Sequence, residues 1–130
     1  NVLDRLNGKI HLILGNHDMK NIRQGYINRF ENVVMQMHIE IGKRCIYLNH
    51  YPFLCFGGSY RDVWQLFGHV HTSPHNTGLD APRLKALFPT QYDVGVDNNN
   101  FTPVSFEQVR KIILKQVESC KDEKNKQTII

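Results

Sequence analysis

Apolar positions divide the chain into short runs with two different periods, separated by glycine, proline and polar turns. The mostly apolar run at residues 9–14 predicts a buried strand, and the alternation at residues 33–41 predicts a strand with one buried face. A Gly42-Lys43 turn leads from residues 33–41 into another strand at residues 44–49, so we expect a hairpin there. The remaining predicted strands are residues 64–67 and 92–96.

Helical spacing appears between and after these strands. Residues 21–30 predict a short helix, and residues 82–87 predict another. The clearest helix begins after Ser105, because Gln108 three residues later completes a capping box. Its apolar face, which should pack on a sheet, consists of Val109, Ile112, Ile113, Val117 and Cys120. We expect the polar tail at residues 122–130 to fray.

Length and composition indicate one folded domain over residues 1–130. A chain of 130 residues that is 41% hydrophobic and 22% charged can form one hydrophobic core and has the composition of a globular protein. With its mixed periods, the chain is predicted to combine helices and strands. No stretch reaches the roughly 18 consecutive apolar residues of a membrane span, so we expect no membrane partner.

Charge and cysteine content add two expectations. The formal net charge of +4 is diffuse and lies partly in the last helix and tail, so charge alone does not predict a nucleic-acid-binding surface. Cys45, Cys55 and Cys120 have neither CxxC nor CxxH spacing, which argues against a disulfide framework and a zinc ribbon. Three free thiols fit a reducing compartment, and we expect a cytoplasmic location.

Polar side chains follow three of the predicted strands. Gly15-Asn16-His17-Asp18 follows the first strand, His50 follows residues 44–49, and Gly68-His69-Val70-His71 follows residues 64–67. Strand ends are a usual location for sites in layered α/β proteins. In an extended segment His69 and His71 would face the same side and could serve two adjacent metal ions. Such paired ions lie roughly 3.5–4 Å apart, and ligands of this kind suit Mn, Fe, Zn or Co better than Ca.

The order of these motifs resembles the signature of the calcineurin-like metallophosphoesterase family. GNHD at residues 15–18 comes first, then HYP at residues 50–52, then GHVH at residues 68–71. The resemblance extends from about residue 9 to the start of the last helix. It implies a four-layer αββα sandwich, an α/β fold, of which this chain would be the C-terminal part.

The resemblance also implies a role for each motif residue. Asn16, His50 and His69 resemble ligands of the second of two divalent metal ions, and His71 resembles a ligand of the first. His17 resembles the catalytic histidine that does not bind metal, which would donate a proton to the leaving oxygen, with Asp18 orienting it. Mn is the first choice for both ions, and Fe, Zn and Co are alternatives. The implied reaction is hydrolysis of a phosphomonoester or phosphodiester by a hydroxide bound between the two ions.

The chain departs from the family pattern in one respect. The upstream Asp-x-His and Gly-Asp-x-x-Asp motifs, which would supply the other metal ligands, do not occur in it. Residues 1–6 look like the end of an amphipathic helix, so we expect a missing N-terminal segment to complete the domain. In the alternative, the chain is a non-catalytic scaffold that binds protein or nucleic acid. The substrate is left open, with nucleotides and nucleic acids among the candidates.

Other polar residues have more ordinary interpretations. We expect His11, His38 and His75 to be surface or core histidines rather than ligands. Asp97 could hydrogen-bond a ligand histidine, but a turn is an equal alternative, so we leave it outside the site. The cations and tyrosine that could contact a substrate phosphate are Lys20, Arg23, Tyr60 and Arg61. Trp64 and Phe67 should belong to the core.

Overall fold

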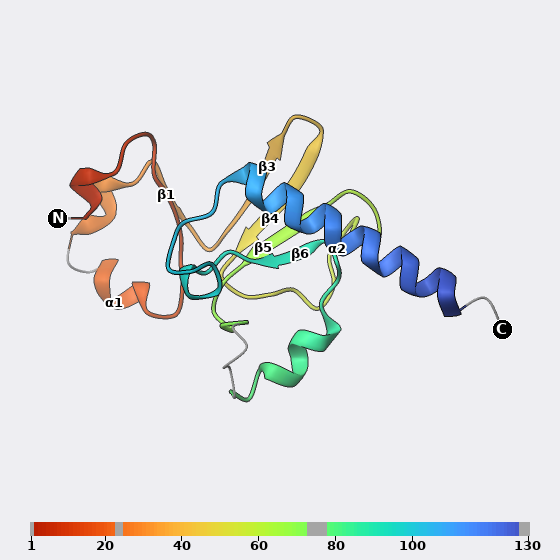
Figure 1. Ribbon diagram of the computed structural model, residues 1–130. Helices are drawn as coiled ribbons and strands as arrows, with labels where there is room; N and C mark the ends of the chain where they lie inside the picture. Colours follow the sequence, from red (N-terminus) through yellow and green to blue (C-terminus); the bar gives the residue numbers. More distant parts are fainter. Residues whose placement is uncertain (1, 23–24, 73–77, 128–130) are drawn as a thin grey trace.

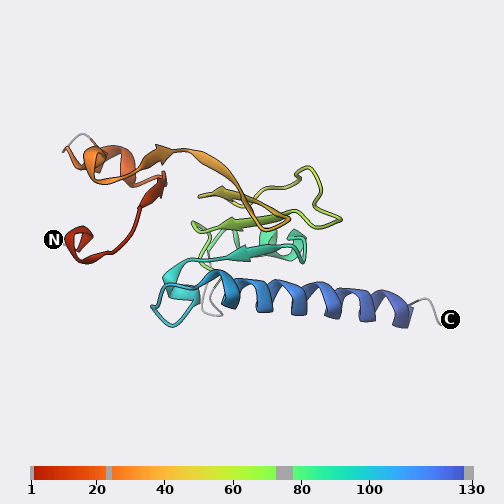
Figure 2. The ribbon, with the colours of Figure 1, turned by 90° about the horizontal axis from the view of Figure 1, so that it is seen from above.

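The computed structural model describes residues 2–22, 25–72 and 78–127 and has mixed α and β structure. Its described strands form two sheets, one with two strands and one with four. The long C-terminal helix α2 (Phe106–Gln127) lies along the four-stranded sheet, as Figure 1 and Figure 2 show. No helix in these residues is long and apolar enough to cross a bilayer.

The described residues as far as Val34 form the smaller sheet and the short helices around it. Strand β1 (His11–Ile13) pairs in parallel with β2 (Asn32–Val34). The short helices of this part are η1 (Leu3–Arg5), α1 (Asp18–Ile22) and η2 (Tyr26–Arg29). The single helix expected at residues 21–30 is therefore wrong, because Gly25 has a left-handed backbone with φ of 85° and η2 begins after it.

The strand expected at residues 33–41 is also divided. Strand β2 ends at Val34 and pairs with β1, whereas β3 (Gln36–Ile41) belongs to the larger sheet. The side chain of Met35 between them is exposed. The alternation of apolar residues does not reveal the break between β2 and β3, because the period of two continues while the pairing partner of the chain changes.

The larger sheet has the order β3-β4-β5-β6. The predicted hairpin is confirmed: β3 pairs antiparallel with β4 (Arg44–Asn49). Strands β5 (Trp64–Phe67) and β6 (Gln91–Asp93) continue the sheet in parallel with β4. The C-terminal ends of β4, β5 and β6 therefore meet at one edge of the sheet. Strand β6 is shorter than the predicted residues 92–96, because the chain turns into η4 (Val96–Asn98).

The hydrophobic core lies between this sheet and α2. Val109 and Ile113 of the helix are buried against Ile46 and Trp64 of the sheet. The capping box is confirmed: the Gln108 backbone N–H donates to Ser105 Oγ at 3.3 Å, and the Ser105 N–H donates to Gln108 Oε1 at 2.8 Å.

Two further segments lie away from this core. The tail expected to fray from residue 122 is helical as far as Gln127, and side chains 121–126 are exposed. A 3-10 helix, η3 (Ala81–Ala86), occupies most of the predicted helix at residues 82–87.

Candidate metal centre

Three polar atoms from distant parts of the chain converge beside the edge where the parallel strands end. His50 Nε2 lies 2.8 Å from Asn16 Oδ1 and 3.0 Å from His69 Nδ1. His69 Nδ1 and Asn16 Oδ1 are 3.2 Å apart, which closes a triangle. The three residues follow β1, β4 and β5 respectively, so the structure brings together three of the six predicted site residues.

The dimensions of this triangle fit one face of a metal coordination sphere. Adjacent ligands about 2.1 Å from an octahedral ion lie about 3.0 Å from each other, close to all three edges. Two imidazole nitrogens and an amide oxygen are also ligands that Mn, Fe, Zn and Co accept. The described residues contain no group of three or more His, Cys, Asp or Glu side chains placed to hold a metal ion. The donor set therefore fits a metal on one face, and further ligands would have to complete it.

The electrostatics of His50 favour the form that can bind a metal. Burial lowers the pKa of His50 below 6.5, and the neighbouring His69 lowers it further, while Asp18 acts in the opposite direction. The imidazole is consequently neutral near pH 7. A neutral imidazole has the unshared electron pair that metal coordination requires.

Close packing against Gly15 sets the position of the His50 ring. A Cβ atom at residue 15 would lie 2.9 Å from both Cε1 and Nδ1 of His50, which is closer than such contacts normally allow. The glycine of the GNHD motif therefore leaves room for the ring of a histidine 35 positions further along the chain.

Replacing Gly15 with alanine is expected to displace His50 and weaken metal binding by roughly 10–100-fold, the usual effect of misorienting a ligand. Gly57→Ala is the matched control, because an added Cβ there meets nothing within 4 Å. Titration of both purified variants with Mn would measure the effect. Equal affinities would mean that the Gly15 contact does not position a ligand.

A buried pair of glutamines holds the loop after His50 on the sheet. Gln65 Nε2 donates to the Tyr51 carbonyl at 3.0 Å, and Gln91 Nε2 donates to the Phe53 carbonyl at 2.9 Å. The two side chains are also joined, because Gln91 Nε2 donates to Gln65 Oε1 at 2.7 Å. Sequence reasoning missed both residues. Gln65 was a visible signal, as a glutamine inside the otherwise apolar strand predicted at residues 64–67, whereas Gln91 lies just before the strand predicted at residues 92–96.

His71 does not join the triangle, and the extended conformation expected for residues 69–71 is wrong. Strand β5 ends at Phe67, and the Val70 N–H donates to the Gly68 carbonyl at 2.6 Å in a tight turn. His69 and His71 both have left-handed backbones, with φ of 58° and 47°. The segment is thus not extended, so the argument that His69 and His71 face the same side no longer applies. Such conformations cost free energy and cluster at functional sites.

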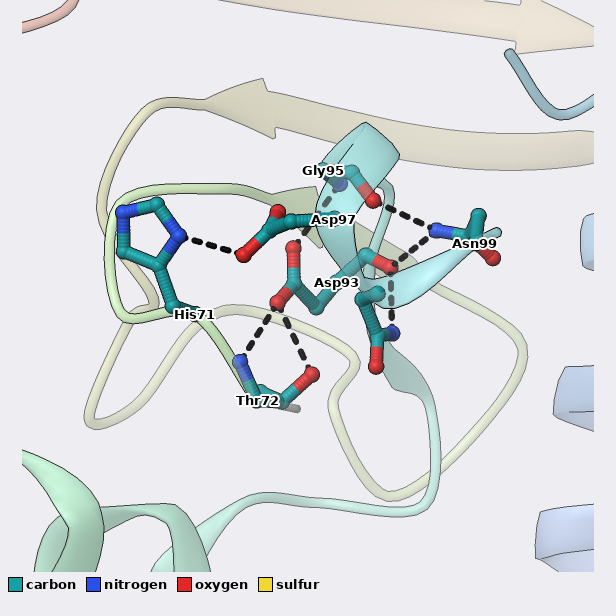
Figure 3. Close-up of polar contacts among 7 residues, drawn as sticks. His71, Thr72, Asp93, Gly95, Asp97 and Asn99 are labelled. Carbon is teal, nitrogen blue, oxygen red and sulfur yellow. Dashed lines mark hydrogen bonds and ion pairs between the residues drawn. The ribbon is translucent and has the colours of Figure 1, made fainter. Parts of the chain in front are cut away.

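The His71 ring instead pairs with a carboxylate. Its Nδ1 contacts Asp97 Oδ2, and Figure 3 shows the ring directed at that side chain. Asp97, which we left outside the site, is therefore the polar partner of a predicted ligand. This contact holds one ring nitrogen of His71 and leaves Nε2 as its other donor atom.

Asp93 organises the segment that carries His71 and Asp97. Its buried carboxylate accepts hydrogen bonds from the backbone N–H and the hydroxyl of Thr72, at 2.9 and 2.8 Å, and from the Gly95 N–H at 2.9 Å (Figure 3). It thus links the turn after β5 to the turn after β6. Sequence analysis gave this residue no role, because its partners are distant or lie in irregular segments.

His17 and Asp18 lie beside the triangle in the turn after β1. The His17 side chain is exposed, and its ring makes no hydrogen bond within the described residues. Asp18 Oδ2 accepts a hydrogen bond from the Gly15 N–H at 2.6 Å. Asp18 thus closes the turn that presents Asn16 and His17. Within the described part of the chain, its carboxylate makes no hydrogen bond to the His17 ring that it was expected to orient.

The other residues considered from the sequence lie outside the triangle or outside the described residues. His38 stacks on Tyr47 with ring centroids 4.6 Å apart, and His11 Nδ1 lies 2.8 Å from the Asn32 amide nitrogen, so neither joins the triangle. Trp64 and Phe67 are buried, as expected. Lys20, Tyr60 and Arg61 are exposed, whereas Arg23 and His75 lie outside the described residues.

No family model matches the chain. No curated protein matches it either. Among solved structures, the fold is similar to "The Crystal Structure of the Protein of Unknown Function AQ665 from Aquifex aeolicus", with a TM-score of 0.60 and 20% sequence identity. The match covers 85% of this chain and 64% of that protein, so the chain spans less than two thirds of its length. Similarity at this level shows that the two proteins share a mixed α/β fold.

Proposed function

We propose that the protein is a metal-dependent phosphoesterase, a hydrolase of phosphomonoesters or phosphodiesters, in which Asn16, His50 and His69 bind one divalent ion. The observation that supports this most is the convergence of three donor atoms whose residues are separated by 34, 19 and 53 positions. Bound divalent ions neutralise charge on phosphoryl oxygens and activate water near neutral pH. Mn is the first choice of metal, with Fe, Zn and Co as alternatives.

The other motif residues have complementary roles in this proposal. The exposed His17 ring, one residue from Asn16, donates a proton to the leaving oxygen of the ester. Asp18 keeps the turn closed through its hydrogen bond to Gly15. His71 is a ligand of a second ion through the nitrogen that Asp97 does not contact, and Asp97 fixes the ring orientation.

The proposal includes an N-terminal segment beyond these residues that supplies carboxylate ligands and completes a four-layer αββα sandwich. Two features of the small sheet support it. Strands β1 and β2 form a parallel pair, and parallel sheets are normally covered on both faces. An apolar cavity of about 240 Å³ lies beside this pair, with Leu12 and Val33 from the two strands and Leu3, Ile22, Ile27 and Phe30 from the adjoining segments.

The three cysteines are free thiols in the structure, which supports a cytoplasmic location within the same proposal. The proposed partners are the phosphate-ester substrate, with nucleotides and nucleic acids as candidate classes, and the N-terminal segment. A membrane partner is not part of the proposal.

The test combines metal analysis with an assay on the full-length protein. Elemental analysis should find two divalent ions per molecule, and bis(p-nitrophenyl) phosphate or p-nitrophenyl phosphate should be hydrolysed with Mn and not after EDTA treatment. Bound metal without turnover of any phosphate ester would favour the non-catalytic scaffold. Absence of bound metal at millimolar Mn would contradict the metal site itself.

A further inference from the structure

A cavity of about 530 Å³ lies directly beside the candidate metal centre and shares His69 with it. One side consists of the loop after β4, including Tyr51 and Leu54. The other side consists of η3, including Leu84, and of Leu87 directly after it. His69 lines the same cavity while its Nδ1 belongs to the donor triangle. Part of a molecule bound at the triangle could therefore occupy this cavity.

The walls of the cavity suit a flat, apolar group. Most of its lining residues are aliphatic or aromatic, and its volume lies within the range of sites for small organic ligands. Tyr51 is packed edge-on against His50 and His69, with ring centroids 4.9 and 4.6 Å away, yet 41% of its surface is exposed. A half-exposed ring held in place by its neighbours offers a stacking surface at little entropic cost.

Charge is sparse at this cavity and lies at its rim. Arg83 is the lining residue with a permanent charge, and its side chain is 83% exposed with Nη1 3.1 Å from Asp80 Oδ1. A guanidinium can stack on an aromatic ring or pair with a phosphate oxygen. The interior of the cavity therefore favours an uncharged group, while its rim tolerates the anionic end of a ligand.

We infer that this cavity binds the organic group of the phosphate ester, and that this group is an aromatic ring, so the substrates are aryl or nucleoside phosphates. The inference rests on the proposed function, because it takes the donor triangle as the site of the phosphoryl group. Stacking on Tyr51 and contact with Leu84 and Leu87 favour a ligand with an aromatic ring over one without. A phosphate ester with a small aliphatic group would leave water in the cavity and bind less tightly.

The test measures equilibrium binding of three phosphonates that cannot be hydrolysed, by calorimetry on the full-length protein with Mn and with EDTA. Phenylphosphonate is expected to bind about tenfold more tightly than methylphosphonate, and also more tightly than cyclohexylphosphonate. Equal affinity for the phenyl and methyl compounds would overturn the inference. Equal affinity for the phenyl and cyclohexyl compounds would overturn its aromatic part.

Variants of the η3 wall connect the preference to the cavity. Leu84→Asn makes the wall polar and Ala86→Phe fills the space, and both should bring the phenyl-to-methyl ratio close to one while methylphosphonate affinity stays unchanged. Leu114→Asn, the same substitution at an exposed position of α2, should keep the ratio. If Leu84→Asn fails to fold, the phenyl-to-methyl ratio of Ala86→Phe alone tests the inference. An unchanged ratio in a folded Ala86→Phe protein would place the ring elsewhere and overturn the inference.

The two proposals fail in distinguishable ways. Mn-dependent binding of all three phosphonates with no phenyl preference would overturn the cavity inference and leave the metal centre supported. A phenyl preference that is identical with Mn and with EDTA, and is lost in Ala86→Phe, would support the ring-binding cavity and contradict the role of the metal in phosphate binding.

Discussion

Replacing His50 with alanine is expected to lower kcat/KM for bis(p-nitrophenyl) phosphate by roughly 10³-fold, together with a loss of bound Mn. His50 Nε2 is the atom closest to both other donors of the triangle, so its removal leaves two ligands from different parts of the chain. Metal ions contribute several kcal/mol to such reactions, and each 1.36 kcal/mol is a factor of ten in rate. Elemental analysis and steady-state kinetics on the same preparation would measure both effects.

The matched control is His38→Ala. His38 is a histidine of the same sheet, but it stacks on Tyr47 in the β3-β4 hairpin and has no contact with the triangle. Its replacement should leave metal content and kcat/KM within about twofold of the parent protein, as for most surface substitutions. Full activity in His50→Ala, with unchanged metal content, would show that the triangle is a structural cluster and not a metal centre.

Replacing His17 with alanine is expected to lower kcat by roughly 10²–10⁴-fold while metal content stays unchanged, the usual contribution of a general acid. The expected loss depends on the leaving group. An ester with a phenolate or alkoxide leaving group needs the proton and should show the full effect, whereas p-nitrophenolate leaves without protonation and should show much less. Measuring kcat for phenyl phosphate and p-nitrophenyl phosphate on both proteins gives the comparison.

Met19→Ala is the control for this second prediction, because Met19 is an exposed residue of α1 two positions after His17. It should change neither kcat nor the ratio between the two esters. Loss of metal in His17→Ala would indicate that His17 is a ligand. An equal loss of activity for both esters, with metal retained, would indicate a role in binding the phosphoryl group instead of proton donation.

Several features followed from the sequence because their causes are local. The hairpin depends on the Gly42 turn, where φ is 62°, and on alternation in the two adjacent strands. The start of α2 depends on two side chains three residues apart, and its buried face depends on the spacing of Val109 and Ile113. Short-range geometry of this kind is set by neighbouring residues and is therefore visible in one sequence.

The sequence also located polar residues at strand ends. Asn16, His50 and His69 were expected to belong to one site because each follows a predicted strand, and strand ends are a usual location for sites. Their polar atoms do converge in the structure. The identification of these residues as metal ligands remains a prediction, and so does the likeness to metallophosphoesterases.

Long-range contacts decided the remaining features. Every second residue from 33 to 41 is apolar, yet β2 and β3 join different sheets, because β1 and β4 are their respective partners. Pairing partners come from distant segments, and the period of two is the same for either choice. The sequence could therefore indicate that strands form here without indicating where one ends.

The path of the GHVH segment is the clearest case of a tertiary effect. Its sequence is compatible with extended structure, but the tight turn at Gly68 and the buried carboxylate of Asp93 hold the following residues in another path. His69 then reaches the triangle, whereas His71 reaches Asp97, 26 residues away. The sequence determined which side chains can take part in chemistry, because residue type and spacing are local properties. The tertiary structure decided which of them meet, because burial and hydrogen bonds between distant segments outweigh the local backbone preference.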